Sequence, residues 1–186
     1  LSYSLNKERC AFDVCPMNIV LNDFARQLGF DYDHEGNMAK SGVVNESCLK
    51  ALNGLEYYQQ PPPKSLGVEW VKDKIYPIIN QYHLKPEDAL ATLTEHAADQ
   101  LVMVLRGWVG QALCTGGGVL NTLFISRVRA KLTDMELIIP EQELVNGKEA
   151  LIFALLGVLR WENNYNALQS VTGADCSSTG GAIYYY

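Results

Sequence analysis

Two short stretches of the sequence hold residues whose types and spacing could do chemistry. The first contains three consecutive glycines, Gly116, Gly117 and Gly118, which stand between an apolar stretch and a helical pattern. Glycines at such a junction let a ligand approach the backbone, and the N–H groups at a helix start attract anions. The spacing matches neither the dinucleotide fingerprint nor the P-loop, and a tight turn explains the cluster equally well. A nucleotide site and a plain turn are therefore both open.

The second candidate is an aspartate, Asp13. It lies in a run of small and apolar residues and precedes Pro16 and a helical pattern, so we expect its carboxylate at the carboxyl end of a strand. Ligands of open α/β sheets collect at those ends. A turn-forming or helix-capping role is the alternative for an aspartate in this position.

The elements expected around these residues are short strands and amphipathic helices. Apolar residues recur every second residue in the strands and every three to four residues in the helices. We expect strands at 1–5, 10–16, 112–114 and 135–139, and helices at about 20–28, 86–106, 120–132 and 148–161. The last helix is apolar on nearly all sides, so we expect it to be buried between a sheet and other helices. The order of the elements implies an α/β layer.

A mixed segment runs from residue 29 to about residue 82. It contains the prolines Pro61, Pro62 and Pro63, which forbid a regular helix, between short helical patterns. We interpret it as an insertion that carries its own helices. At the other end of the chain, residues 184–186 are expected to form a strand or a tail.

Composition narrows the class of protein. Of the 186 residues, 48% are hydrophobic, as in an ordinary globular protein. The net charge of -6, with no cluster of Lys and Arg, argues against a nucleic-acid partner. The longest apolar run, 150–159, is too short for a bilayer, which takes about 20 residues, so we expect no membrane partner. The five cysteines form no C-x-x-C pair and no secretory signal is found, so a cytoplasmic location is expected.

Six short motifs together resemble the anhydro-N-acetylmuramic acid kinase family and occur in that family's order. They are AFDVCPMN at 11–18, PPPKSLGVE at 61–69, LATLTE at 90–95, TGGGVLN at 115–121, EALIFA at 149–154 and VTGA at 171–174. Each motif is weak alone, but the six in order are specific. The resemblance covers essentially the whole chain.

The resemblance implies an α/β fold, namely the second lobe of an actin-like (ribonuclease H-like) ATPase that closes on ATP and Mg²⁺ between two lobes. Residues 1–186 would form this C-terminal lobe, with the helical insertion at about 29–82. The chain starts with Leu1 rather than Met, and the family's N-terminal lobe and its phosphate-binding loop are expected to be absent from it. Because half of the active site would then be missing, we expect the fragment alone to be inactive. A homodimer is also expected.

The implied reaction is the cleavage of the 1,6-anhydro bond of anhydro-N-acetylmuramic acid by water, coupled to phosphoryl transfer from ATP to O6. The product would be N-acetylmuramic acid 6-phosphate, an intermediate of peptidoglycan recycling. By match to the family's motifs, Asp13 is the catalytic base, and Asn18 and Glu149 bind the sugar. Gly116–Gly118 and Asn121 bind the nucleotide, and no residue is assigned to a metal.

Departures from the family pattern keep other functions open. The family usually has Gly where this chain has Cys15 and Met17, so the backbone near Asp13 need not have the same conformation. A non-catalytic actin-like module is the main alternative. Another small-molecule kinase, or an ATP-using hydrolase of the same superfamily, is a third.

Several single residues have simpler explanations. Glu149 is expected in the first turn of a helix, where the helix dipole alone would favour a carboxylate. His96 and Asp99, three residues apart, are expected on a solvated helix face rather than in a metal site. Cys15 has no histidine in a family-like arrangement that would activate it as a nucleophile.

Overall fold

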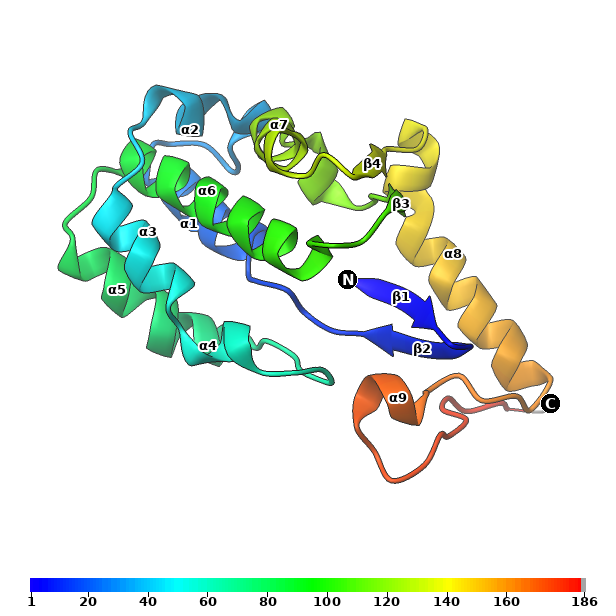
Figure 1. Ribbon diagram of the computed structural model, residues 1–186. Helices are drawn as coiled ribbons and strands as arrows, with labels where there is room; N and C mark the ends of the chain where they lie inside the picture. The colour runs from blue at the N-terminus through cyan, green and yellow to red at the C-terminus, as the bar shows by residue number, and fades with distance from the viewer. Residues whose placement is uncertain (185–186) are drawn as a thin grey trace. The chain divides into compact units, whose positions relative to one another are not determined.

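The computed structural model of the protein describes residues 1–184, so Tyr185 and Tyr186 of the expected terminal strand or tail lie outside it. Within the described residues the fold is mixed α/β, with small two-stranded sheets and many helices (Figure 1). The chain divides into two compact units, which we describe one at a time. The first unit comprises 1–13, 61–65 and 142–186, and the second comprises 14–60 and 66–141.

The first unit opens with a β-hairpin. Strands β1 (Ser2–Leu5) and β2 (Glu8–Ala11) pair antiparallel, with Asn6 and Lys7 between them. Both turn residues have positive φ, 51° and 70°, the conformation that matches the twist of a two-residue hairpin. The expected hairpin is confirmed, although β2 ends at Ala11, earlier than the sequence indicated.

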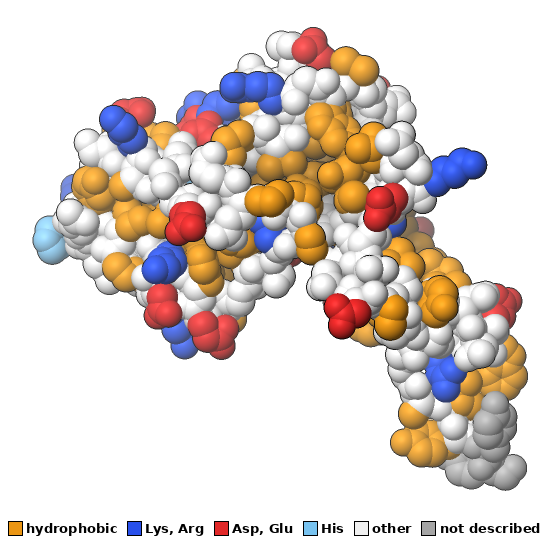
Figure 2. All heavy atoms as spheres, turned by 60° about the horizontal axis from the view of Figure 1, so that its bottom comes forward, with side chains coloured by type: hydrophobic (Ala, Val, Ile, Leu, Met, Phe, Trp, Pro, Cys, Tyr) orange, Lys and Arg blue, Asp and Glu red, His pale blue; other side chains and the backbone are white. Residues whose placement is uncertain are grey.

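The first unit also contains the long helix α8 (Gln142–Trp161) and the short helix α9 (Gln169–Thr172). The expectation that α8 is buried is wrong, because most of its apolar side chains are exposed: Leu151 by 60% and Phe153 by 72%. Hydrophobic side chains are visible on the surface of the molecule in the space-filling view (Figure 2). An all-round apolar pattern shows that a helix needs cover, but it does not show which chain supplies that cover.

Helix α6 (Pro86–Leu105) organises the second unit. Its bounds confirm the expected helix, with Pro86 in the first turn followed by Glu87 and Asp88. Twelve of its residues are buried, and α1, α2, α3 and α7 all pack against it (Figure 1). The remaining helical elements of this unit are α1 (Asn18–Gln27), η1 (His34–Gly36), α2 (Asn37–Ser41), α3 (Glu46–Asn53), η2 (Glu56–Gln59), α4 (Val68–Trp70), η3 (Val71–Ile75), α5 (Tyr76–Gln81), η4 (Gly117–Leu120) and α7 (Thr122–Lys131).

The segment interpreted as an insertion shares the core of the second unit. Cys48, Leu52 and Ile75 from this segment are fully buried in one cluster with Val20 of α1 and Leu90 of α6. The helices of the segment therefore contribute to the same hydrophobic core as α1 and α6. Its origin as an insertion stays a prediction.

A strand–helix–strand unit completes the second unit. Strands β3 (Gly110–Leu113) and β4 (Met135–Ile138) pair in parallel, with Gly110 opposite Met135. Helix α7 connects them and buries Phe124 and Val128. This confirms the strand–helix–strand order expected from the sequence.

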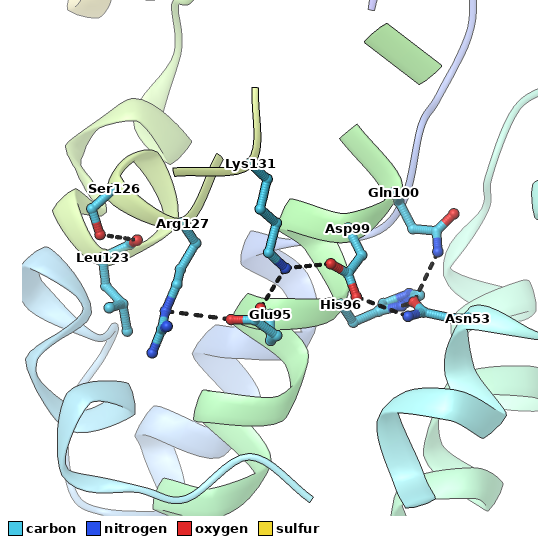
Figure 3. A network of polar contacts seen from close by, with 9 residues as sticks. All are labelled: Asn53, Glu95, His96, Asp99, Gln100, Leu123, Ser126, Arg127 and Lys131. Atoms are coloured by element: carbon cyan, nitrogen blue, oxygen red, sulfur yellow. Dashed lines mark hydrogen bonds and ion pairs between the residues drawn. The ribbon is translucent and has the colours of Figure 1, made fainter. Parts of the chain in front are cut away.

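A polar network ties α6 to α3 and α7 (Figure 3). The Asn53 carboxamide oxygen can only accept, so His96 Nδ1 donates to it at 2.6 Å, which leaves Nε2 to accept from the Tyr58 hydroxyl at 2.8 Å. On the other side of the helix, Lys131 pairs with Glu95 and Asp99.

His96 is therefore a neutral core residue. The expectation from the sequence that it lies on a solvated helix face is wrong. His96 is 1% exposed. Burial lowers the pKa of His96 to about 4, against the opposing attraction of Asp99. The residue types around His96 gave the wrong expectation. A histidine can lie on a buried helix face when both of its ring nitrogens are hydrogen-bonded.

We predict a pH-dependent stability that His96 controls. The unfolded histidine takes up its proton near pH 6.5, whereas the folded one stays neutral to about pH 4, so acidification favours unfolding. Between pH 7 and pH 5 this difference lowers the free energy of unfolding by about 2 kcal/mol. Urea denaturation at both pH values should show this loss in the wild type and a much smaller loss in His96→Gln. His34→Gln, at an exposed histidine, should keep the wild-type loss, and equal losses in all three proteins would contradict the assignment.

Candidate functional site

The glycine loop follows β3 and lies against the start of α1. Gly116 has φ 85° and ψ 167°, a conformation that requires glycine. A Cβ atom added to Gly117 would lie 3.6 Å from Asn18 Nδ2, and one on Gly118 would lie 3.4 Å from Met17 Sδ. The structure therefore brings Asn18, assigned to the sugar, next to two of the glycines assigned to the nucleotide, although about a hundred residues separate them in sequence.

The 3-10 turn η4 starts inside the glycine loop. The first N–H groups of a helical turn have no partner within the turn, so those of Gly117 and Gly118 are the ones that an anion would use here. The loop thus combines a backbone that only glycine allows at Gly116 with an ordinary contact distance, 3.6 Å, between Asn18 Nδ2 and a Cβ placed on Gly117. This arrangement is suited to the close approach of a phosphate or a ribose.

Asn121 caps the helix that follows the loop. Its Oδ1 accepts a hydrogen bond from the Phe124 backbone N–H at 3.0 Å, and the residue is buried. A Cβ on Gly36 would lie only 2.5 Å from this oxygen, so Gly36 leaves room for the cap. The structure gives the Asn121 side chain a positioning role at the start of α7, and its contact with a nucleotide stays a prediction.

Asp13 lies two residues after the end of β2, and it is exposed. Its backbone N–H donates to the Lys64 carbonyl oxygen at 3.2 Å, and the Lys64 ammonium lies 5.6 Å from the centre of the Phe12 ring. Burial lowers the pKa of Lys64. The Lys64 side-chain nitrogen thus lies over Phe12, the residue that precedes Asp13.

Three of the recognised motifs meet in the first unit. The segment that contains Lys64 also contains Pro63, whose Cγ lies 3.0 Å from the position of a Cβ on Gly173. The motifs at 11–18, 61–69 and 171–174 thus meet through Asp13, Lys64, Pro63 and Gly173. Sequence reasoning missed Lys64 as a neighbour of Asp13. The only signal was its place in one of the recognised motifs.

Glu149 is exposed on α8. The helix starts at Gln142, so Glu149 lies about two turns inside it rather than in its first turn. The helix dipole acts on charges within the first turn, and it therefore does not explain a carboxylate here. The simple alternative for Glu149 was based on the wrong helix start.

The assigned residues divide between the two units. Asp13 and Glu149 belong to the first unit, and Asn18, the glycine loop and Asn121 belong to the second. Within the second unit the structure brings Asn18 and the loop together.

Two other chemistries find no support in the described residues. Burial raises the pKa of Cys15 to about 12, so its thiol stays protonated at neutral pH and is a poor nucleophile. Among residues 1–184, no three His, Cys, Asp or Glu side chains gather in a group that could hold a metal ion.

None of the helices described in residues 1–184 combines the length and the apolar character needed to cross a bilayer.

Comparisons with known proteins agree with the motifs. A family model described as anhydro-N-acetylmuramic acid kinase matches residues 3–186. The chain is 34% identical over 189 residues to the anhydro-N-acetylmuramic acid kinase of Francisella tularensis subsp. novicida, covering 95% of this chain and 49% of that protein. It is 31% identical over 185 residues to the kinase of that name from Hydrogenovibrio crunogenus, covering 94% and 50%.

A third relative, from Clostridioides difficile, has the same name and is 31% identical over 176 residues, covering 88% of this chain and 46% of that protein. The chain thus spans about half the length of the curated relatives it matches. With a family model that covers nearly every residue, the chain belongs to the anhydro-N-acetylmuramic acid kinase family.

Proposed function

We propose that this chain is the second lobe of an ATP-dependent sugar kinase of this family. The kinase would cleave the 1,6-anhydro bond of anhydro-N-acetylmuramic acid with water and phosphorylate O6. The observation that carries the proposal is the contact between Asn18 and the loop of Gly117 and Gly118 in a chain that also keeps Asp13. Two motifs with different assigned ligands meet there, as a site that joins sugar and nucleotide would need.

The proposal also concerns the fold: the chain would form the second of two lobes. The chain covers about half of its relatives, and its mixed α/β composition fits one lobe of an actin-like ATPase. The other lobe would supply the remaining contacts to the phosphates, so the chain alone would be inactive. A homodimer and a cytoplasmic location stay predictions.

Asp13 would act as the base of the reaction. It would accept a proton from the water that attacks the anomeric carbon while the bond between that carbon and O6 breaks. O6 then takes the phosphoryl group instead of a proton. The exposed position of Asp13 after β2 leaves its carboxylate accessible to a substrate. Asn18 and Glu149 would orient the sugar.

The residues of the glycine loop fit a nucleotide. The positive φ at position 116 requires a glycine. A Cβ placed on Gly117 would lie at an ordinary contact distance from Asn18 Nδ2. ATP with Mg²⁺, when bound, would supply the phosphoryl group and neutralise charge on it. Magnesium at nucleotide sites is held by one or two carboxylates together with phosphates, so a group of three protein ligands is not required.

A non-catalytic module is the second candidate, and Met17 favours it. The family usually has glycine at this position, and here the Met17 sulfur lies 3.4 Å from the position of a Cβ on Gly118. The methionine side chain fills space beside the loop that a glycine would leave open. Weaker nucleotide binding would follow from this contact.

The first test of the kinase uses Asp13→Asn in a polypeptide that carries both halves of the family's length. The amide keeps the shape but cannot take a proton, so turnover should fall by roughly a hundredfold or more. Binding of ATP and sugar should change only a few-fold. The measurement is the amount of sugar phosphate and ADP formed from anhydro-N-acetylmuramic acid, ATP and Mg²⁺, with Asp31→Asn as an exposed control. Near-normal turnover would remove Asp13 from the catalytic role.

The second test uses Gly117→Val in the same protein. The branched side chain would occupy space that the nucleotide needs, so ATP affinity measured by calorimetry should fall at least tenfold, about 1.4 kcal/mol. The melting temperature should change little, because Gly117 has an ordinary φ and its nearest neighbour lies at 3.6 Å. Gly180→Val is the matched control, since a Cβ there also meets its neighbour, Asn166 Oδ1, at 3.6 Å. Unchanged ATP affinity would show that the loop is only a turn.

The third test asks whether Met17 weakens nucleotide binding, the observation that favours the module. If its side chain narrows the loop, Met17→Gly should raise ATP affinity several-fold, and Met17→Leu, of similar volume, should leave it unchanged. Because Met17 also packs against the core of the second unit, the melting temperature of each variant is measured beside its ATP affinity. Equal affinity in all three proteins would show that Met17 does not limit nucleotide binding.

A further inference from the structure

Helix α8 presents an apolar stripe to solvent. We define the α8 stripe as Leu144, Leu151, Leu155 and Val158, which are 36%, 60%, 56% and 53% exposed. At about 100° per residue, these four positions fall within roughly 60° of one another around the helix. A Cβ added to Gly147, which borders the stripe, would meet nothing within 4 Å. Within the described residues of the first unit, the stripe is therefore uncovered.

Such a stripe is costly in water. A helix that is apolar on nearly all sides is normally buried, and soluble monomers rarely expose large contiguous apolar patches. Larger exposed patches mark surfaces that bind another protein or another part of the same fold. The stripe therefore points to a partner with an apolar surface of its own.

The greater length of the relatives points to the partner, namely the half of the family's sequence that this chain does not match. The match with the Francisella kinase covers 95% of this chain but only 49% of that kinase. The match with the Hydrogenovibrio kinase covers 94% of this chain and 50% of that kinase. The family's fold thus contains a second portion of similar size that this chain does not span. We propose that the α8 stripe docks onto this uncovered half.

The inference needs only the shared family and the exposed stripe. It requires neither ATP binding nor turnover, so its test reads association alone. Failure of the kinase reaction would leave it intact, because binding of the two halves can be measured without substrate or turnover.

The experiment mixes the 186-residue chain with a separate polypeptide. The probe is the half of the Francisella kinase that this chain does not match. Biolayer interferometry should show binding of the wild-type chain and at least a hundredfold weaker binding of the double variant Leu151→Asp/Leu155→Asp, since docking would bury two carboxylates without partners. Val158→Asp should weaken binding in the same direction.

Phe153→Asp is the matched control. Phe153 lies on the opposite side of α8, is 72% exposed, and also replaces an exposed apolar side chain by a carboxylate when changed to Asp. Its affinity should stay within about threefold of wild type. Equal weakening by Phe153→Asp, or no binding of the wild-type chain to the probe, would overturn the proposal.

Two measurements on the chain alone exclude other occupants. If the stripe is uncovered, the double variant should melt within a few degrees of Phe153→Asp. A much larger loss, or failure to fold, would mean that the chain itself covers the stripe, and the proposal would be wrong. Light scattering should give the same mass for wild type and double variant. A wild-type dimer that the double variant converts to a monomer would assign the stripe to a second copy of the chain instead.

Discussion

The packing of α6 is the constraint on which the second unit depends. Helices α1 and α7 both lie against α6, and the ion pairs of Lys131 with Glu95 and Asp99 fix α7 to it (Figure 3). Because α1 begins at Asn18 and α7 follows the glycine loop, their common packing surface sets where the two starts lie. The contact between Asn18 and Gly117 is thus a consequence of core packing rather than of a local motif. A change that loosened α6 would separate the two halves of the candidate site.

Much of the fold could be predicted because local signals were strong. The start of α6 at Pro86 and the parallel strands around α7 follow from apolar spacing and from the residues at the ends. The start of α8 was missed because Gly147 and the polar residues before it read as a loop. The burial of His96 was missed for another reason. Its acceptability depends on Asn53 and Tyr58, which come from other helices and carry no signal in the sequence near His96.

The candidate site was predictable only in part. Motif matches identified Asp13 and the glycine loop, because residue types at fixed spacing survive without knowledge of the fold. The neighbours of these residues could not be identified, since Lys64 reaches Asp13 through a backbone hydrogen bond between segments 51 residues apart. The capping of α7 by Asn121 is the opposite case, because an Asn before an apolar helix is a local capping signal that the sequence itself contains.

Helix α8 and the strand pair of β3 and β4 both leave apolar side chains exposed. Parallel strands are normally covered on both faces and are rarely stable as an isolated pair, yet β3 is mostly exposed and Leu113 at its end is 64% exposed. Surfaces that bury one another in a whole fold are left exposed when they are divided between polypeptide segments. If the α8 stripe docks as proposed, its apolar residues would belong to a core that this chain only partly contains, since the chain spans about half the length of its relatives. The apolar pattern of α8 would then report the core of the whole family fold, and its exposure would report how much of that core this chain closes on its own.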